Sequence, residues 1–277
     1  MQQRLASIKQ KFPQFPTALS PELPTALRKD YFILFGSTLD MEKLTAFQQK
    51  CGQNFMLFDC WIQSNNIVLL LRGSWNRQYL ESAHFLQLDL APLHFHARLQ
   101  QAGLLVMDMD STAIQIECID EIAKLAGTGE LVSSITARAM RGELDFEQSL
   151  RSRVSTLKGA PETILQQVRE SMPLMPGVQE TIKELQKYGW KTAIASGGFT
   201  YFADYLKDLL KLDFAVSNQF EIENGRLTGN VSGDIVHAQY KMDTLLHLAT
   251  QYGIAMENTV AIGDGANDLA MMAAANL

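Results

Sequence analysis

The chain has 277 residues, enough for one large domain or two ordinary ones with separate cores. Hydrophobic residues make up 47% of it and charged residues 19%, a composition typical of soluble globular proteins that excludes a disordered or fibrous chain. The net charge of −6 is uneven, because residues 1–98 carry 10 Lys/Arg against 7 Asp/Glu and residues 99–277 carry 14 against 23. A metal site is therefore expected in the second part of the chain.

The sequence also excludes several classes of protein. No apolar run approaches the roughly 18 residues that a membrane helix needs, and the charged N-terminus lacks the apolar segment of a secretory signal. No basic cluster with interleaved aromatic residues suggests a nucleic-acid partner. The 3 cysteines show no metal-binding spacing, so reduced thiols are expected. These features predict a cytoplasmic protein with neither a membrane nor a nucleic-acid partner.

A small α+β domain is predicted for residues 1–98. Its first 25 residues contain Pro13, Pro16, Pro21 and Pro24 and are expected to form an irregular lead-in. Alternating apolar residues and helical spacing then predict the order βαββαβ. The predicted strands are residues 31–36, 54–62, 66–73 and 85–90, and the predicted helices are residues 41–50 and 76–82. This topology resembles that of ACT-type regulatory modules.

A larger α/β domain is predicted for residues 99–277. Short apolar runs alternate with helical stretches, which is the pattern of a doubly wound parallel sheet covered on both faces. Asn224-Gly225 lies between two alternating segments and predicts a tight hairpin. Residues 116–175 are mainly helical and form an insert after the first strand. The predicted strands are residues 104–107, 191–195, 214–217 and 259–262, and the other predicted helices lie at 178–185, 199–210 and 240–252.

Polar residues follow three of these predicted strands. Residues 108–112 (DMDST), 196–198 (SGG) and 263–268 (GDGAND) come directly after strands 104–107, 191–195 and 259–262. The carboxyl ends of parallel strands meet at one edge of the sheet, where ligands bind. Two carboxylates one residue apart can serve as nucleophile and acid/base. Carboxylate oxygens suit a hard cation such as Mg²⁺, and the glycine turn can approach a phosphate.

These motifs resemble those of the haloacid dehalogenase-like phosphatases and, among them, the phosphoserine phosphatases. Residues 108–112 match the first motif of the family, residues 196–198 the second, Lys241 the third and residues 263–268 the fourth. The insert strengthens the resemblance, because residues 116–121 (IECIDE) and 139–153 (AMRGELDFEQSLRSR) look like the substrate-binding cap of these enzymes.

The resemblance implies a role for each motif residue. Asp108 is expected to attack phosphorus and form an aspartyl phosphate, and Asp110 to act as general acid and then general base. Mg²⁺ is expected to be held by Asp108, Asp264 and the backbone carbonyl of Asp110, with Asp268 as an outer support. The expected ligands of the phosphoryl oxygens are Ser196, the Gly197 N–H group and Lys241, with Asn267 close by.

The cap is expected to recognise the amino-acid end of the substrate. Glu117 would pair with the ammonium group, and Arg153 would bind the carboxylate through its guanidinium fork. Met140 and Phe146 would wall the site and exclude water. The resemblance thus implies Mg²⁺-dependent hydrolysis of O-phospho-L-serine to L-serine and phosphate, the last step of L-serine biosynthesis. A homodimer formed through the N-terminal domain is a further expectation.

The sequence leaves three alternatives open. A phosphatase or phosphotransferase of the same chemistry could act on another small phosphorylated metabolite. A signalling receiver also accepts phosphate on an aspartate, although it needs no cap with Glu117 and Arg153. A nucleotide-binding module would need a GxGxxG or GxxxxGK pattern, which the glycine turns lack. Family members usually continue past the position of Leu277 through another strand and helix, so a sheet edge and a helix face without cover are expected there.

Overall fold

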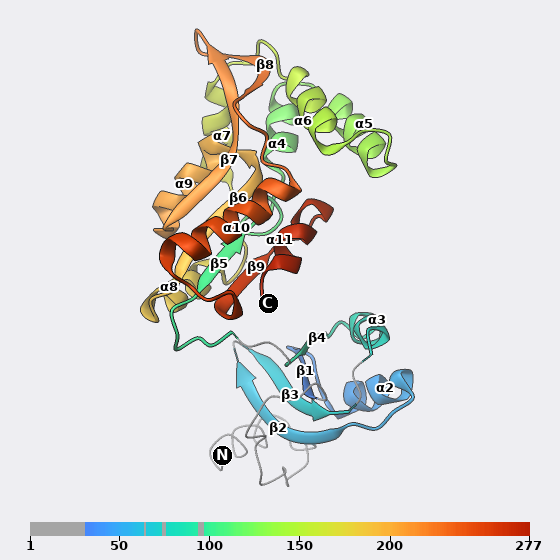
Figure 1. Ribbon diagram of the computed structural model, residues 1–277. Coiled ribbons are helices and arrows are strands. Elements are labelled where there is room, and N and C mark those ends of the chain that lie inside the picture. Colours follow the sequence, from blue (N-terminus) through green and yellow to red (C-terminus); the bar gives the residue numbers. More distant parts are fainter. Residues whose placement is uncertain (1–30, 64, 74–75, 94–96) are drawn as a thin grey trace. The chain divides into compact units, whose positions relative to one another are not determined.

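The computed structural model describes residues 31–277 except 64, 74–75 and 94–96, so the expected lead-in of residues 1–25 lies outside the described residues. The chain divides between residues 95 and 96 into two compact units (Figure 1). None of the helices described is long and apolar enough to cross a membrane.

The first unit has the predicted order βαββαβ. It consists of β1 (Tyr31–Gly36), α2 (Met41–Cys51), β2 (Met56–Gln63), β3 (Asn66–Arg72), α3 (Gln78–Phe85) and β4 (Asp89–Pro92). The strands form an antiparallel sheet in the order β2-β3-β1-β4. Side chains that alternate along β1 and β3, such as Phe32, Leu34 and Leu69, form a core with Phe47 of α2 and Tyr79 of α3.

One predicted strand of this unit is wrong in position. The segment 85–90 was expected to be extended, but Phe85 ends α3 and the strand covers Asp89–Pro92. The helix end occupies the next residues, because the Leu86 and Gln87 N–H groups donate to the carbonyls of Ala83 and His84. Gln87 has a φ of 56°, which turns the chain back toward the sheet.

The second unit is built on a five-stranded sheet. Its strands are β5 (Leu104–Met107), β6 (Lys191–Phe199), β7 (Phe214–Glu223), β8 (Arg226–Ser232) and β9 (Thr259–Ile262), in the order β8-β7-β6-β5-β9. The pairs β7–β6, β6–β5 and β5–β9 are parallel, as predicted. The predicted hairpin joins β7 to antiparallel β8, and both Asn224 and Gly225 have the positive φ that its tight turn requires.

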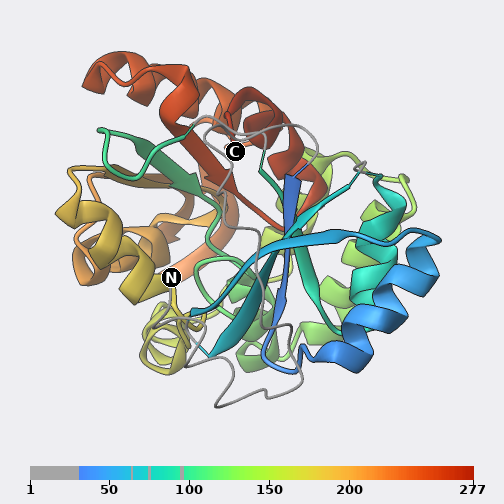
Figure 2. The same ribbon diagram turned by 90° about the horizontal axis from the view of Figure 1, so that it is seen from below.

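Helices cover both faces of this sheet, as Figures 1 and 2 show. Along β5, Leu105 and Met107 face a core that includes side chains of α8 (Val178–Lys187) and α9 (Thr200–Leu210). Leu104 and Val106 face the opposite core, formed with α10 (Ala238–Tyr252) and α11 (Leu269–Ala274). The chain is therefore doubly wound around the sheet, as the sequence pattern predicts.

The insert between β5 and β6 is helical. It contains α4 (Cys118–Leu125), α5 (Gly129–Met140), α6 (Phe146–Ser155) and α7 (Thr163–Ser171), all within the predicted range 116–175. A capping box starts α6, because Asp145 accepts from the Gln148 N–H and the Gln148 side chain accepts from the Asp145 N–H. The segment between α6 and α7 bonds to the β7–β8 hairpin through Gly159 N–H to Leu227 O (2.8 Å), Leu227 N–H to Ala160 O (2.9 Å) and Glu162 N–H to Gly225 O (2.9 Å).

Strand β6 is longer than predicted. The sequence suggested an end at Ala195, before the SGG motif, but the strand continues to Phe199. Its pairing with β7 shifts register between Ala195 and Phe199, so residues 196–198 form an irregularity inside the strand. Glycines leave this segment without side chains to mark a strand, which is why the sequence pattern stops too early.

Candidate active site

A cavity of about 640 Å³ lies at the carboxyl ends of the parallel strands in the second unit. Its floor comes from the residues that follow β5 and β9 and from the irregular part of β6, and its walls come from the insert. Every predicted site residue except Lys241 and Asp268 lines it: Asp108, Asp110, Glu117, Met140, Phe146, Arg153, Ser196, Gly197, Asp264 and Asn267. Residues from three strand ends and the insert are thus brought to one place.

Asp108 is held at the floor by the neighbouring strand. Its N–H group donates to the carbonyl of Ile262 (2.9 Å), the last residue of β9. Its Oδ1 accepts from the Met109 N–H (2.7 Å), and its Oδ2 lies 3.0 Å from Nζ of Lys241. The pKa of Asp108 is raised above its usual value, because the effect of burial exceeds the opposite effect of the nearby Lys241 ammonium. A carboxylate with so little water around it is poorly solvated and therefore suited to nucleophilic attack.

Lys241 is buried outside the cavity lining and contacts two carboxylates. Its Nζ donates to Oδ1 of Asp268 at 2.7 Å, and neither side chain is exposed to solvent. The other oxygen of Asp268 accepts from the Gly265 N–H (2.9 Å), which fixes the turn after β9. Lys241 therefore connects Asp108 with that turn.

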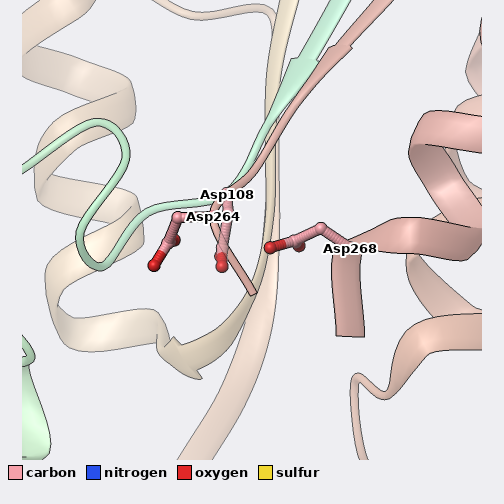
Figure 3. Close-up of side chains that lie close together, drawn as sticks. All are labelled: Asp108, Asp264 and Asp268. Carbon is pink, nitrogen blue, oxygen red and sulfur yellow. The ribbon is translucent and has the colours of Figure 1, made fainter. Parts of the chain in front are cut away.

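Three aspartates form an acidic cluster beside this lysine. Asp108, Asp264 and Asp268 each present a carboxylate oxygen within 4.8 Å of the others, and their side chains lie close together in Figure 3. Asp264 is exposed and accepts from the Thr112 hydroxyl (3.0 Å), whereas the other two are buried. Three carboxylates around one ammonium leave excess negative charge, and their oxygens are the donors that a hard divalent cation prefers. This cluster can therefore hold a metal ion.

The Asp110 carboxyl is hydrogen-bonded to the start of the insert. Its Oδ1 accepts from the Cys118 N–H (2.9 Å), at the start of α4. Burial raises the pKa of Asp110 to about 7, with the Glu117 carboxylate adding to the shift. A group with such a pKa can both give and accept a proton near neutral pH. A β-carbon on Gly198 would lie 2.5 Å from Oδ2 of Asp110, so a larger residue would displace this carboxyl.

The SGG segment lines the same cavity as Asp108. Ser196 is buried, and its Oγ accepts from the Gly198 N–H (2.9 Å). Phe146 of the insert covers Gly197 so closely that a β-carbon there would lie 2.8 Å from its Cζ. The same β-carbon would lie 3.5 Å from Nδ2 of Asn267. Small residues in this segment thus let the insert and the turn after β9 approach it.

The predicted cap residues line the upper part of the cavity. Glu117 accepts from the hydroxyl of Ser111 (2.7 Å). The pKa of Glu117 is raised mainly by burial and further by the nearby carboxylates of Asp120, Asp264 and Asp108. Arg153 is largely buried, which lowers the pKa of its guanidinium, and its Nε has no hydrogen-bond partner. Met140 lines the cavity but is 84% exposed, so it stands at the entrance.

Two side chains at or near the cavity were not predicted from the sequence. Thr136 of α5 lines the cavity with a buried hydroxyl that has no hydrogen-bond partner. Thr136 could have been predicted to line the cavity, because it lies one helical turn before Met140. Asn218 is fully buried and bonds to the carbonyl of Gly197 (2.8 Å). No sequence pattern marks Asn218, because the contact depends on the register between β6 and β7.

Known proteins share both the sequence and the fold. Residues 103–276 match the haloacid dehalogenase-like hydrolases, and residues 28–92 match a domain of unknown function. The phosphoserine phosphatase of Haemophilus influenzae is 67% identical over 98% of this chain and 86% of its own length. That of Vibrio cholerae is 53% identical over 91% and 77%.

Solved structures agree with these relatives. The crystal structure of a probable phosphoserine phosphatase from Vibrio cholerae has a TM-score of 0.80 at 51% identity, covering 96% of this chain and 82% of that one. A phospho-aspartyl intermediate analogue of a phosphoserine phosphatase has a TM-score of 0.61 at 43% identity, covering 64% and 85%. The chain therefore belongs to the haloacid dehalogenase-like hydrolases and, within them, to the phosphoserine phosphatase family.

Proposed function

We propose that this chain hydrolyses O-phospho-L-serine to L-serine and phosphate through an aspartyl-phosphate intermediate, as the last step of L-serine biosynthesis. The observation that carries the proposal is the pairing of Asp108 and Asp110 at the end of β5, in a cavity that also holds Glu117 and Arg153 of the insert. A phosphoryl-transfer site and a site for a zwitterion thus share one cavity.

The two carboxyl groups would divide the chemistry. An oxygen of Asp108 would form a bond to phosphorus as the bond from phosphorus to the serine oxygen breaks, and protonated Asp110 would give its proton to that oxygen. Asp110 would then take a proton from the water that attacks phosphorus and releases Asp108. The pKa of Asp110 near 7 suits both proton transfers. Ser196, the Gly197 N–H group and Lys241 would bind the phosphoryl oxygens, with Asn267 beside them.

The acidic cluster fits Mg²⁺. Asp108, Asp264 and the backbone carbonyl of Asp110 would hold it, and Asp268 would support the site through Lys241 and the Gly265 N–H. The bound cation would offset the repulsion between phosphate and these carboxylates.

The insert would recognise the amino-acid end of phosphoserine. Glu117 would bind the ammonium group and Arg153 the carboxylate, because the two opposite charges line the same cavity. Thr136 Oγ1 and Arg153 Nε are buried in the cavity wall without partners, and a buried unpaired donor costs about 1–3 kcal/mol. A carboxylate would satisfy both donors. Met140 and Phe146 would wall the site.

The N-terminal domain, residues 1–98, would serve association or regulation. The residues proposed for chemistry all lie in residues 99–277, and the sheet of the first unit could pair with a second copy to give a homodimer. We place the enzyme in the cytoplasm, where its substrate would be a small soluble metabolite.

Phosphate release from L-phosphoserine, measured with Mg²⁺ and with a chelator, tests the function. Rapid release that needs the cation is expected. A panel of other phosphorylated metabolites serves as the comparison. If a metabolite without the amino-acid group were hydrolysed faster than phosphoserine, the substrate assignment would be wrong, although the phosphatase chemistry would still hold.

A further inference from the structure

The irregular segment of β6 depends on one side chain of β7. Where the pairing of the two strands shifts register, between Ala195 and Phe199, residues 196–198 leave the regular ladder. The carbonyl of Gly197 is instead satisfied by Nδ2 of Asn218, which donates to it at 2.8 Å. Asn218 is fully buried, so no water would replace this bond if it were lost.

This bond also determines how Ser196 is presented. The Gly197 carbonyl and the Gly198 N–H belong to the same peptide group, and that N–H donates to Ser196 Oγ (2.9 Å). Asn218 therefore holds one end of a rigid peptide plane whose other end contacts the serine hydroxyl. Because Oγ already accepts there, its own proton is free to point at a ligand in the cavity.

The opposite end of the Asn218 amide reaches a second element of the site. Its Oδ1 accepts from the Val236 N–H at 2.9 Å. Val236 directly precedes His237, whose side chain accepts from the Tyr240 N–H and caps α10. Lys241 lies in the first turn of that helix. One buried amide thus links the strand that carries Ser196 with the helix that carries Lys241.

We propose that Asn218 is a positioning residue that sets the relative placement of Ser196 and Lys241, the two side chains that would bind the transferred phosphoryl group. The inference rests on the proposed phosphatase function and adds to it a residue outside the cavity lining. Asn218 acts through the peptide between Gly197 and Gly198 and through the start of α10, and it does not touch the substrate.

A double-mutant cycle tests the proposal. Asn218→Asp keeps an acceptor for Val236 but removes the amide donor to Gly197, and we expect kcat/KM for p-nitrophenyl phosphate to fall about 10- to 100-fold. In a Ser196→Ala background the same change should cost less than about threefold, because the hydroxyl that Asn218 positions is already absent. Equal losses in the two backgrounds, or a loss below threefold in the first, would overturn the proposal.

Asn258 provides a matched control for stability. It is also a buried asparagine, and its Nδ2 donates to the carbonyls of Gln101 (3.0 Å) and Ala102 (2.8 Å) at the other end of the sheet. Asn258→Asp should lower the unfolding midpoint to a similar degree while leaving kcat/KM within about threefold of wild type. A similar loss of activity in both variants would mean that Asn218 serves the fold alone.

Two further measurements keep the test decisive. If Asn218→Asp does not fold, the same cycle is run with Asn218→Ser, whose shorter side chain cannot reach Gly197. If the wild-type protein hydrolyses no phosphate ester, the proposed function fails, and the cycle is read from the dissociation constant of inorganic phosphate. Non-additive weakening of phosphate binding supports the positioning role, and additive weakening contradicts it.

Discussion

Lys241 and Asp268 form a fully buried ion pair, with 2.7 Å between Nζ and Oδ1. The pair joins α10 to the turn after β9 and places its positive end 3.0 Å from Asp108. Its two charges compensate each other only while both are present, since a buried charge without a partner is costly. The pair therefore has consequences for stability that are separate from any role in binding phosphate.

The first prediction concerns this pair. Lys241→Met should lower the free energy of unfolding by about 3–5 kcal/mol, because it leaves Asp268 buried without its cation. Asp268→Asn should cost less, since Asp108 remains as a partner for Lys241. Denaturant titration in the absence of divalent cations measures both changes, and the reverse ranking would contradict the importance of the Asp268 contact.

The second prediction concerns the nucleophile. Asp108→Asn should abolish turnover while the far-ultraviolet circular dichroism spectrum stays that of wild type, because the amide cannot form the acyl phosphate. Beryllium fluoride should bind to the wild-type protein and not to the variant. Activity of the variant within about tenfold of wild type, roughly 1.4 kcal/mol of barrier, is incompatible with the mechanism.

The third prediction concerns substrate recognition. Arg153→Ala and the nearly isosteric Thr136→Val should each raise KM for phosphoserine far more than KM for a phosphate ester without the amino-acid group. Both remove a donor that lines the cavity and lacks a partner in the protein. Thr192→Val is the control, because the Thr192 hydroxyl is also buried without a partner but does not line the cavity. If the Arg153 variant raised KM equally for both substrates, Arg153 would instead bind the phosphate group or stabilise the fold.

The fourth prediction concerns the thiols. Burial raises the pKa of Cys60 to about 12 and raises the pKa of Cys51 and of Cys118. At pH 8 all three groups should therefore be protonated in the folded protein and react slowly with iodoacetamide, since the thiolate is the nucleophile. In denaturant the three should react at the rate of free cysteine. Rapid labelling of Cys60 in the folded protein at pH 8 would show that the first unit opens.

The fifth prediction concerns the division of labour between the two units. A fragment of the second unit should retain cation-dependent phosphatase activity and lose dimerisation or any response to serine. The fragment should begin before Ala97, because the Ala97 N–H donates to Asn276 and the Arg98 N–H donates to Asn258. The start near Leu99 suggested by the sequence would remove both bonds. A soluble, folded fragment without activity would show that residues of the first unit are needed for catalysis.

The sequence located the strand ends, and therefore the neighbourhood of the site, because the carboxyl ends of parallel strands coincide whatever the details of packing. The positions of Asp108, Asp110 and Asp264 in the cavity could be predicted from this rule and from the family resemblance alone. The contacts of Asn218 and the bond between Lys241 and Asp268 depend on the register of β6 and on the entry of α10, which no local pattern encodes. The early end predicted for β6 arose in the same way, because residues 196–198 carry no strand signal.

Backbone hydrogen bonds hold the α6–α7 segment of the insert to the β7–β8 hairpin. A swing of all four helices as one rigid flap would break the contacts of Gly159, Ala160 and Glu162 with that hairpin. Helix α5 has no such tether among the described backbone hydrogen bonds, and its last residue, Met140, is 84% exposed beside the cavity. Any movement of the insert that admits substrate is therefore expected at its α5 end, because its α6–α7 end is hydrogen-bonded to the hairpin.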